Sequence, residues 1–111
     1  MFRVHKCTQN CGDGCVGIWR CSDNKTLILR CDECYASWLN PEDVSTGVPV
    51  SVNHPDDILP GTSLHVFGGR AGWATREEIE KAGWMRFVTG ESKALDEVWK
   101  EAKERGDVQG I

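Results

Sequence analysis

The chain has 111 residues, a formal net charge of −4 and six cysteines, which fits one small domain. No apolar run reaches the roughly 20 residues that span a bilayer, and the N-terminal residues lack the apolar stretch of a secretory signal. We therefore expect a cytoplasmic protein, whose reduced cysteines favour metal binding over disulfides. The alternative is a secreted, disulfide-rich domain from which a signal peptide has been removed.

Charge is divided unevenly between the two parts of the chain. Residues 1–39 carry five basic and four acidic residues, whereas residues 40–111 carry eight basic and thirteen acidic ones. Non-specific binding to nucleic acid needs clustered lysine and arginine, and the sequence holds no such cluster. An acidic second part would repel a phosphate backbone and attract a basic protein.

Two runs of β-forming residues lie among the cysteines. They are Val16–Cys21 and Thr26–Cys31, and the intervening Ser22–Lys25 has the composition of a tight turn. A two-stranded hairpin is marginally stable in water, so we expect a clamp at its open end. Tyr35–Leu39 is predicted to return along the hairpin as a third strand, which Pro41 ends.

The middle of the chain, residues 41–72, holds all four prolines and is expected to be irregular. Its alternating apolar residues favour two short strands, at 48–52 and at 64–67.

The last third predicts two helices. Thr75 and Glu78 match a capping box for a helix that ends near residue 82, where Gly83 suits a left-handed cap. Residues 84–89 are expected to be extended. Ser92 can cap a second helix that ends near Gly106 and has an apolar stripe typical of a core face.

The cysteine spacing points to a structural zinc site. Cys7 and Cys11 form a first knuckle with three intervening residues, and Cys31 and Cys34 form a second knuckle with two. The hairpin places the two knuckles side by side, and zinc favours four thiolates in a tetrahedron. Cys7, Cys11, Cys31 and Cys34 are thus the predicted ligands of Zn²⁺. Two alternatives remain open: Cys11 with Cys15 as the first pair, or His5 in place of one thiolate.

A knuckle, a hairpin and a second knuckle resemble a zinc ribbon, and residues 31–38 look like the second knuckle of small, uncharacterised bacterial ribbon proteins. The resemblance covers about residues 5–39. It implies an N-terminal zinc ribbon over residues 1–40, and with the predicted strands and helices of the rest of the chain we expect an α+β fold. An α+β extension over residues 41–111 would pack on the ribbon, with an irregular β-containing middle and two C-terminal helices.

A catalytic site is not expected. A closed set of four thiolates is a poor Lewis acid, and the three histidines are scattered along the chain. Cys15 and Cys21 stand at opposite ends of one predicted strand, too far apart to bond, and are interpreted as small buried side chains.

Three functions are compatible with the sequence. The first is a zinc-stabilised protein-interaction module that binds a basic protein partner through its acidic surface. An immunity-like or antitoxin-like protein is one form of this function. The second is a nucleic-acid-binding ribbon, whose contact residues would be Trp19, Arg20, Lys25 and Arg30. The third is a thiol redox enzyme that uses Cys15 or Cys21.

Overall fold

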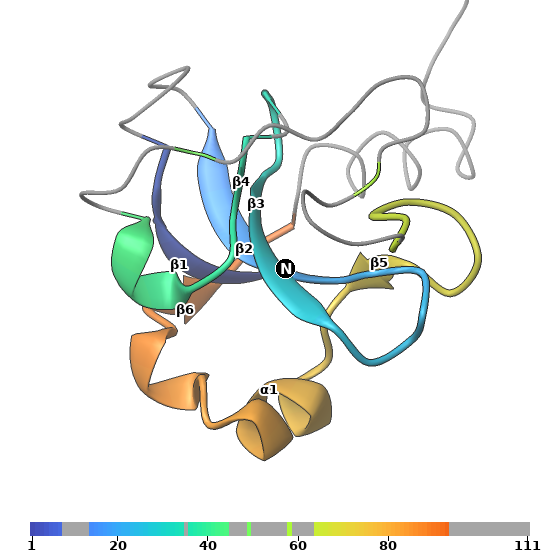
Figure 1. Ribbon diagram of the computed structural model, residues 1–111. Helices are drawn as coiled ribbons and strands as arrows, with labels where there is room; N and C mark the ends of the chain where they lie inside the picture. The colour runs from blue at the N-terminus through green and yellow to red at the C-terminus, as the bar shows by residue number, and fades with distance from the viewer. Residues whose placement is uncertain (8–13, 35, 45–48, 50–57, 59–63, 94–111) are drawn as a thin grey trace, which may run out of the picture.

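The protein is described from a computed structural model, which places residues 1–7, 14–34, 36–44, 49, 58 and 64–93. Within these residues the main feature is a six-stranded antiparallel sheet with the order β4-β3-β2-β1-β6, in which β5 pairs with β2 (Figure 1). The strands are β1 (Phe2–Lys6), β2 (Cys15–Arg20), β3 (Leu27–Cys31), β4 (Ser37–Trp38), β5 (Gly72–Trp73) and β6 (Gly90–Glu91).

The predicted hairpin is confirmed as β2 and β3, which pair along their whole length with Ile18 opposite Leu29. Asn24 takes a left-handed conformation with a φ of 65° in the connecting turn. The Asp23 carboxylate accepts hydrogen bonds from the backbone N–H groups that follow it, which closes the turn locally. The predicted third strand is also present as β4, and it is shortened to Ser37–Trp38.

The predicted α+β class with two C-terminal helices is wrong. The described residues form mostly an antiparallel sheet with one α-helix, α1 (Arg76–Ala82), and two 3-10 helices, η1 (Pro41–Asp43) and η2 (Met85–Phe87). The segment 84–89, expected to be extended, contains η2. The sheet is larger than expected because it includes β1, β5 and β6, which the sequence did not predict.

Ser92, the predicted cap of the second helix, is hydrogen-bonded to the edge of the sheet. Ser92 donates its N–H to the Met1 carbonyl at 3.0 Å, and the Met1 ammonium donates to the Ser92 carbonyl at 2.9 Å. These bonds extend the β1–β6 pairing by one residue, to Ser92. The rest of that predicted helix, 94–106, lies outside the described residues.

Helix α1 forms as the capping pattern predicts. The Thr75 hydroxyl accepts from the Glu78 N–H, and the Glu78 carboxylate accepts from the Thr75 N–H at 2.9 Å. Gly83 ends the helix with a φ of 74°. Ile79 is fully buried and holds this short helix against the sheet. Within the described residues no helix is long and apolar enough to cross a membrane.

Two short strands were predicted in the middle of the chain, and the described residues test one of them. The predicted strand at 64–67 is reduced to one bridge between His65 and Ile58, and most of the other predicted strand, at 48–52, lies outside the described residues.

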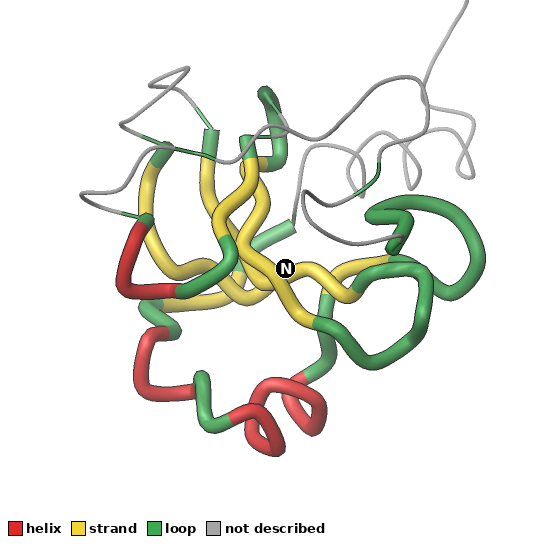
Figure 2. Tube along the Cα trace, viewed as in Figure 1, coloured by secondary structure: helices red, strands yellow, loops and turns green. Residues whose placement is uncertain are grey.

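Apolar side chains cover both faces of the sheet. One cluster includes Val16 and Ile18, and the helical segments that lie along one side of the strands add to it (Figure 2). The second cluster surrounds Trp19, whose indole N–H donates to the Val66 carbonyl at 2.8 Å. The buried Arg30 guanidinium lies over the Trp19 ring, 4.3 Å from its centre, and also contacts two further aromatic rings.

Candidate metal centre

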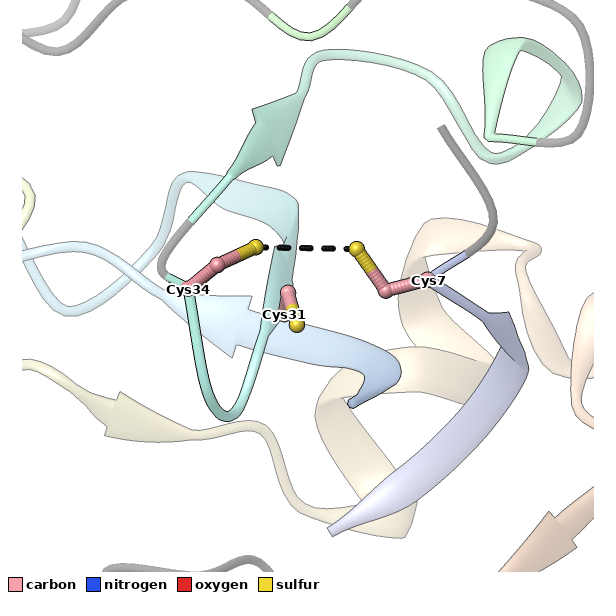
Figure 3. A group of neighbouring side chains, drawn as sticks. All are labelled: Cys7, Cys31 and Cys34. Carbon is pink, nitrogen blue, oxygen red and sulfur yellow. Dashed lines mark hydrogen bonds between the residues drawn. The ribbon is translucent and has the colours of Figure 1, made fainter. Parts of the chain in front are cut away.

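Three cysteines converge where β1 ends and β3 turns into β4. Cys7 directly follows β1, Cys31 is the last residue of β3, and Cys34 lies in the turn toward β4. Their sulfur atoms all lie within 4.8 Å of one another, and Cys7 Sγ and Cys34 Sγ are 3.6 Å apart. Figure 3 shows the side chains of Cys7 and Cys34 pointing toward each other, with Cys31 beside them. This group of three thiols is within metal-binding distance.

The turn that carries Cys34 is fixed to the start of β2 by reciprocal hydrogen bonds. Asp32 donates its N–H to the Cys15 carbonyl at 3.0 Å, and Asp32 Oδ1 accepts from the Cys15 N–H at 2.9 Å. The Glu33 N–H points to Cys31 Sγ at 3.4 Å. A sulfur that accepts N–H bonds is stabilised as a thiolate, which is the form that binds a metal.

Gly14 makes room for this arrangement. Its carbonyl accepts the Cys7 N–H at 2.9 Å, which ties the end of β1 to the start of β2. A Cβ at position 14 would overlap Cys31 Sγ and would lie 3.1 Å from Asp32 Oδ1. Sequence reasoning missed this role because the crowding arises from a residue 17 positions away.

Burial shapes the chemistry of the cluster. Cys7 and Cys31 are fully buried, whereas Cys34 is partly exposed. Burial raises the pKa of the Cys31 thiol well above its usual range; backbone N–H groups of Cys34 and Glu33 oppose this rise, and the neighbouring thiols add to it. Three thiolates without a cation would repel one another, and a metal ion held here would supply the charge that balances such a donor set.

The structure brings together three of the four predicted ligands, Cys7, Cys31 and Cys34; Cys11 lies outside the described residues. Cys15 is not in the group, and it is partly exposed rather than buried as expected. Cys31 pairs with Val16, the neighbour of Cys15, and successive side chains of a strand point to opposite faces, so Cys15 points away from Cys31. His5 is exposed, and its Nδ1 lies 2.7 Å from the Lys6 carbonyl.

The remaining cysteine, Cys21, follows β2 at the end away from the cluster and is fully buried, as expected. Burial raises its pKa to about 11. It therefore behaves as a small buried side chain.

Comparison with known proteins gives a match to a viral protein. An uncharacterised protein of Acanthamoeba polyphaga mimivirus is 30% identical over 69 residues, which are 60% of this chain and 58% of the viral protein. The match thus spans little more than half of that relative, and the viral source argues against the bacterial origin that the ribbon resemblance suggested. No protein-family model matches the chain, so none confirms a zinc ribbon, and no solved structure matches it significantly.

Proposed function

We propose that Cys7, Cys31 and Cys34 bind a structural zinc ion that clamps β1 to the β3–β4 turn. The convergence of the three sulfurs carries this proposal. Tetrahedral zinc with Zn–S bonds of roughly 2.3 Å separates its sulfurs by about 3.8 Å. The distance of 3.6 Å between Cys7 Sγ and Cys34 Sγ is close to that edge. Cys11 remains the proposed fourth ligand from the sequence.

The zinc-stabilised chain would act as a protein-interaction module for a basic partner. The charge division supports this, because residues 40–111 carry five more acidic than basic residues. Among the described acidic groups, Glu77 and Glu80 on α1 and Glu42 on η1 are exposed. An acidic surface suits the phosphate-binding cleft of a nuclease, so an immunity-like or antitoxin-like role is one concrete form of the proposal.

Nucleic-acid binding through the hairpin is less well supported. Trp19 is 7% exposed and Arg30 is 3% exposed, and the two side chains stack on each other. Arg20 pairs with Glu78 at 2.7 Å. Lys25 is thus the one exposed member of the four proposed contact residues. The redox alternative is also weaker, because Cys15 and Cys21 lie at opposite ends of β2, roughly 20 Å apart at 3.3 Å per residue.

The zinc site is tested by the metal-to-protein ratio after purification without chelators. We expect one zinc ion per chain in the wild type and in a Cys15→Ser control, and a strongly reduced ratio in Cys7→Ser, Cys31→Ser and Cys34→Ser. A wild-type protein that stays metal-free after incubation with zinc would contradict the proposal.

The interaction role is tested by affinity capture from the native host at low and high salt. We expect a stoichiometric basic protein whose retention falls as salt rises, because exposed charge pairs are screened. A salt-sensitive shift of labelled DNA or RNA without any stoichiometric protein partner would favour the nucleic-acid alternative and overturn this one.

A further inference from the structure

We propose that a hydroperoxide oxidises Cys7 and Cys34 to a disulfide, which displaces the metal from the cluster while keeping the same two segments joined. The inference rests on the metal site proposed above and concerns the regulation of that site.

The two sulfurs are already close. Cys7 Sγ and Cys34 Sγ are 3.6 Å apart and the side chains point toward each other (Figure 3). A disulfide bond measures about 2.0 Å, so the sulfurs must approach by roughly 1.6 Å. Cys7 follows the end of β1 and Cys34 sits in a turn, so neither residue has to leave the middle of a strand for this approach.

Exposure decides which sulfur reacts first. Cys34 is partly exposed, whereas Cys7 and Cys31 are fully buried. A small oxidant from solvent therefore meets Cys34 first. Cys7 then lies in position to act as the resolving thiol.

Cys31 is held out of this reaction by its surroundings. It is part of the β3 ladder opposite Val16, and its N–H donates to the Ala36 carbonyl at 2.9 Å. Its sulfur lies over Gly14 and accepts the Glu33 N–H. Pairing Cys31 with Cys34 would require moving a sulfur that the backbone already holds in place, whereas pairing Cys7 with Cys34 does not.

The chemistry balances in two steps. The Cys34 thiolate attacks one oxygen of hydrogen peroxide, the O–O bond breaks, hydroxide leaves, and Cys34 becomes a sulfenic acid. The Cys7 thiolate then attacks the Cys34 sulfur, the S–O bond breaks, and a second hydroxide leaves as the S–S bond forms. Cys7 and Cys34 together lose two electrons and the peroxide gains them. A solvent proton is taken up by each hydroxide.

Oxidation thus replaces the metal that joins the two segments with a covalent bond between them. The disulfide removes Cys7 and Cys34 from the proposed ligand set and leaves only Cys31 and the proposed Cys11, which are too few for a closed structural zinc site. The covalent bond spans the same gap between the end of β1 and the β3–β4 turn. The sheet therefore stays joined at this corner after the metal has left.

The test is a disulfide map of the full chain after limited treatment with hydrogen peroxide and alkylation of the remaining thiols. Cleavage after Glu33 separates Cys31 from Cys34, and cleavage after Asp13 separates Cys7 from Cys15. Because Cys7 and Cys11 stay on one peptide, fragmentation of the linked pair must locate the bond; we expect it at Cys7 and Cys34, together with release of one zinc ion for each disulfide formed. A map dominated by Cys31–Cys34, or by a pair that includes Cys11, overturns the proposal.

Variants separate this inference from the zinc proposal. In Cys31→Ser the Cys7–Cys34 disulfide should still form although the metal is lost, and in Cys34→Ser it should be absent. Cys15→Ser is the matched control and should release zinc like the wild type. A wild type that binds zinc and keeps both thiols reduced under peroxide refutes only the redox proposal. A metal-free wild type that forms the disulfide refutes the zinc proposal and the displacement of a metal, and it supports only the pairing of Cys7 with Cys34.

Discussion

Replacing Gly14 with alanine is the sharpest probe of how the fold positions the thiols. The added methyl would occupy the space of Cys31 Sγ and would also press on Asp32 Oδ1, at 3.1 Å, and on Glu33 Cβ, at 3.2 Å. All three contacted groups belong to the segment that carries the second knuckle. The substitution therefore pushes this segment away from the start of β2 without removing a ligand.

The size of the effect follows from the crowding. Overpacking a filled site costs about 1–3 kcal/mol of unfolding free energy. The displaced sulfur must either leave its rotamer or carry the knuckle with it, and both movements disturb the ligand geometry. Changes in the groups that orient metal ligands typically cost about 10–100-fold in affinity, which is the loss of zinc affinity we expect for Gly14→Ala.

Gly68→Ala is the matched control. Gly68 has a φ of 84°, and a Cβ added there would meet no atom within 4 Å, so alanine costs about 1–2 kcal/mol through backbone strain alone. Zinc affinity is measured by competition with a chromophoric chelator, and stability by denaturant unfolding of the zinc-loaded and the zinc-free protein. If Gly14→Ala and Gly68→Ala bind zinc equally tightly, the proposed contact between position 14 and Cys31 is wrong.

Three further predictions concern the rest of the fold. Burial raises the pKa of Glu78, but hydrogen bonds from Thr75 and Arg20 outweigh this effect and hold the pKa below its ordinary value of 4.5. The stability that Glu78 contributes is therefore present above pH 4.5 and is lost as the pH falls through the folded-state pKa. Glu78→Gln should make the free energy of unfolding depend less on pH in this range. Ile79→Ala should lower the free energy of unfolding by about 2–5 kcal/mol, measured with denaturant, because Ile79 is fully buried; a loss below about 1 kcal/mol would mean that α1 contributes little to the core. Cys21 is buried and its pKa is raised to about 11, so it should resist alkylation in the folded protein and react on unfolding. Mass spectrometry of the alkylated protein measures this, and rapid labelling of the native protein would contradict the burial of Cys21.

Local patterns in the sequence predicted local structure well. The turn at Asp23 and Asn24, the capping box at Thr75 and the left-handed Gly83 all occur where their residue types require them. These features depend on neighbours within a few positions, so the sequence contains all of the information. The fold class was predicted wrongly because it depends on pairing between residues far apart in the sequence. Strand β1 pairs with residues near the end of the described chain, and no local pattern records that pairing.

In the candidate site, too, the residues with local constraints were predictable and those with long-range constraints were not. Cys31 and Cys34 were predictable because a two-residue knuckle aims both thiols to one side. The role of Gly14 was not, since its constraint comes from a sulfur on another strand. Arg30 is a similar case: a charged residue in a hairpin is expected to be exposed, but aromatic rings from beyond residue 66 enclose it. That burial is what weakened the nucleic-acid hypothesis.

The position of the cluster explains why a metal would matter to this sheet. Strand β1 lies between β2 and the two-residue β6, and its pairing with β2 is interrupted by a shift in register between Arg3 and His5. The N-terminal end of β1 is held by the reciprocal bonds between Met1 and Ser92. Its other end pairs with β2 at His5 and Lys6, and Cys7 adds a backbone bond to Gly14 and, in the proposed site, a bond to the metal. The proposed zinc ion and the proposed disulfide would therefore have the same effect, which is to join the C-terminal end of β1 to the β3–β4 turn of a hairpin that is already well packed.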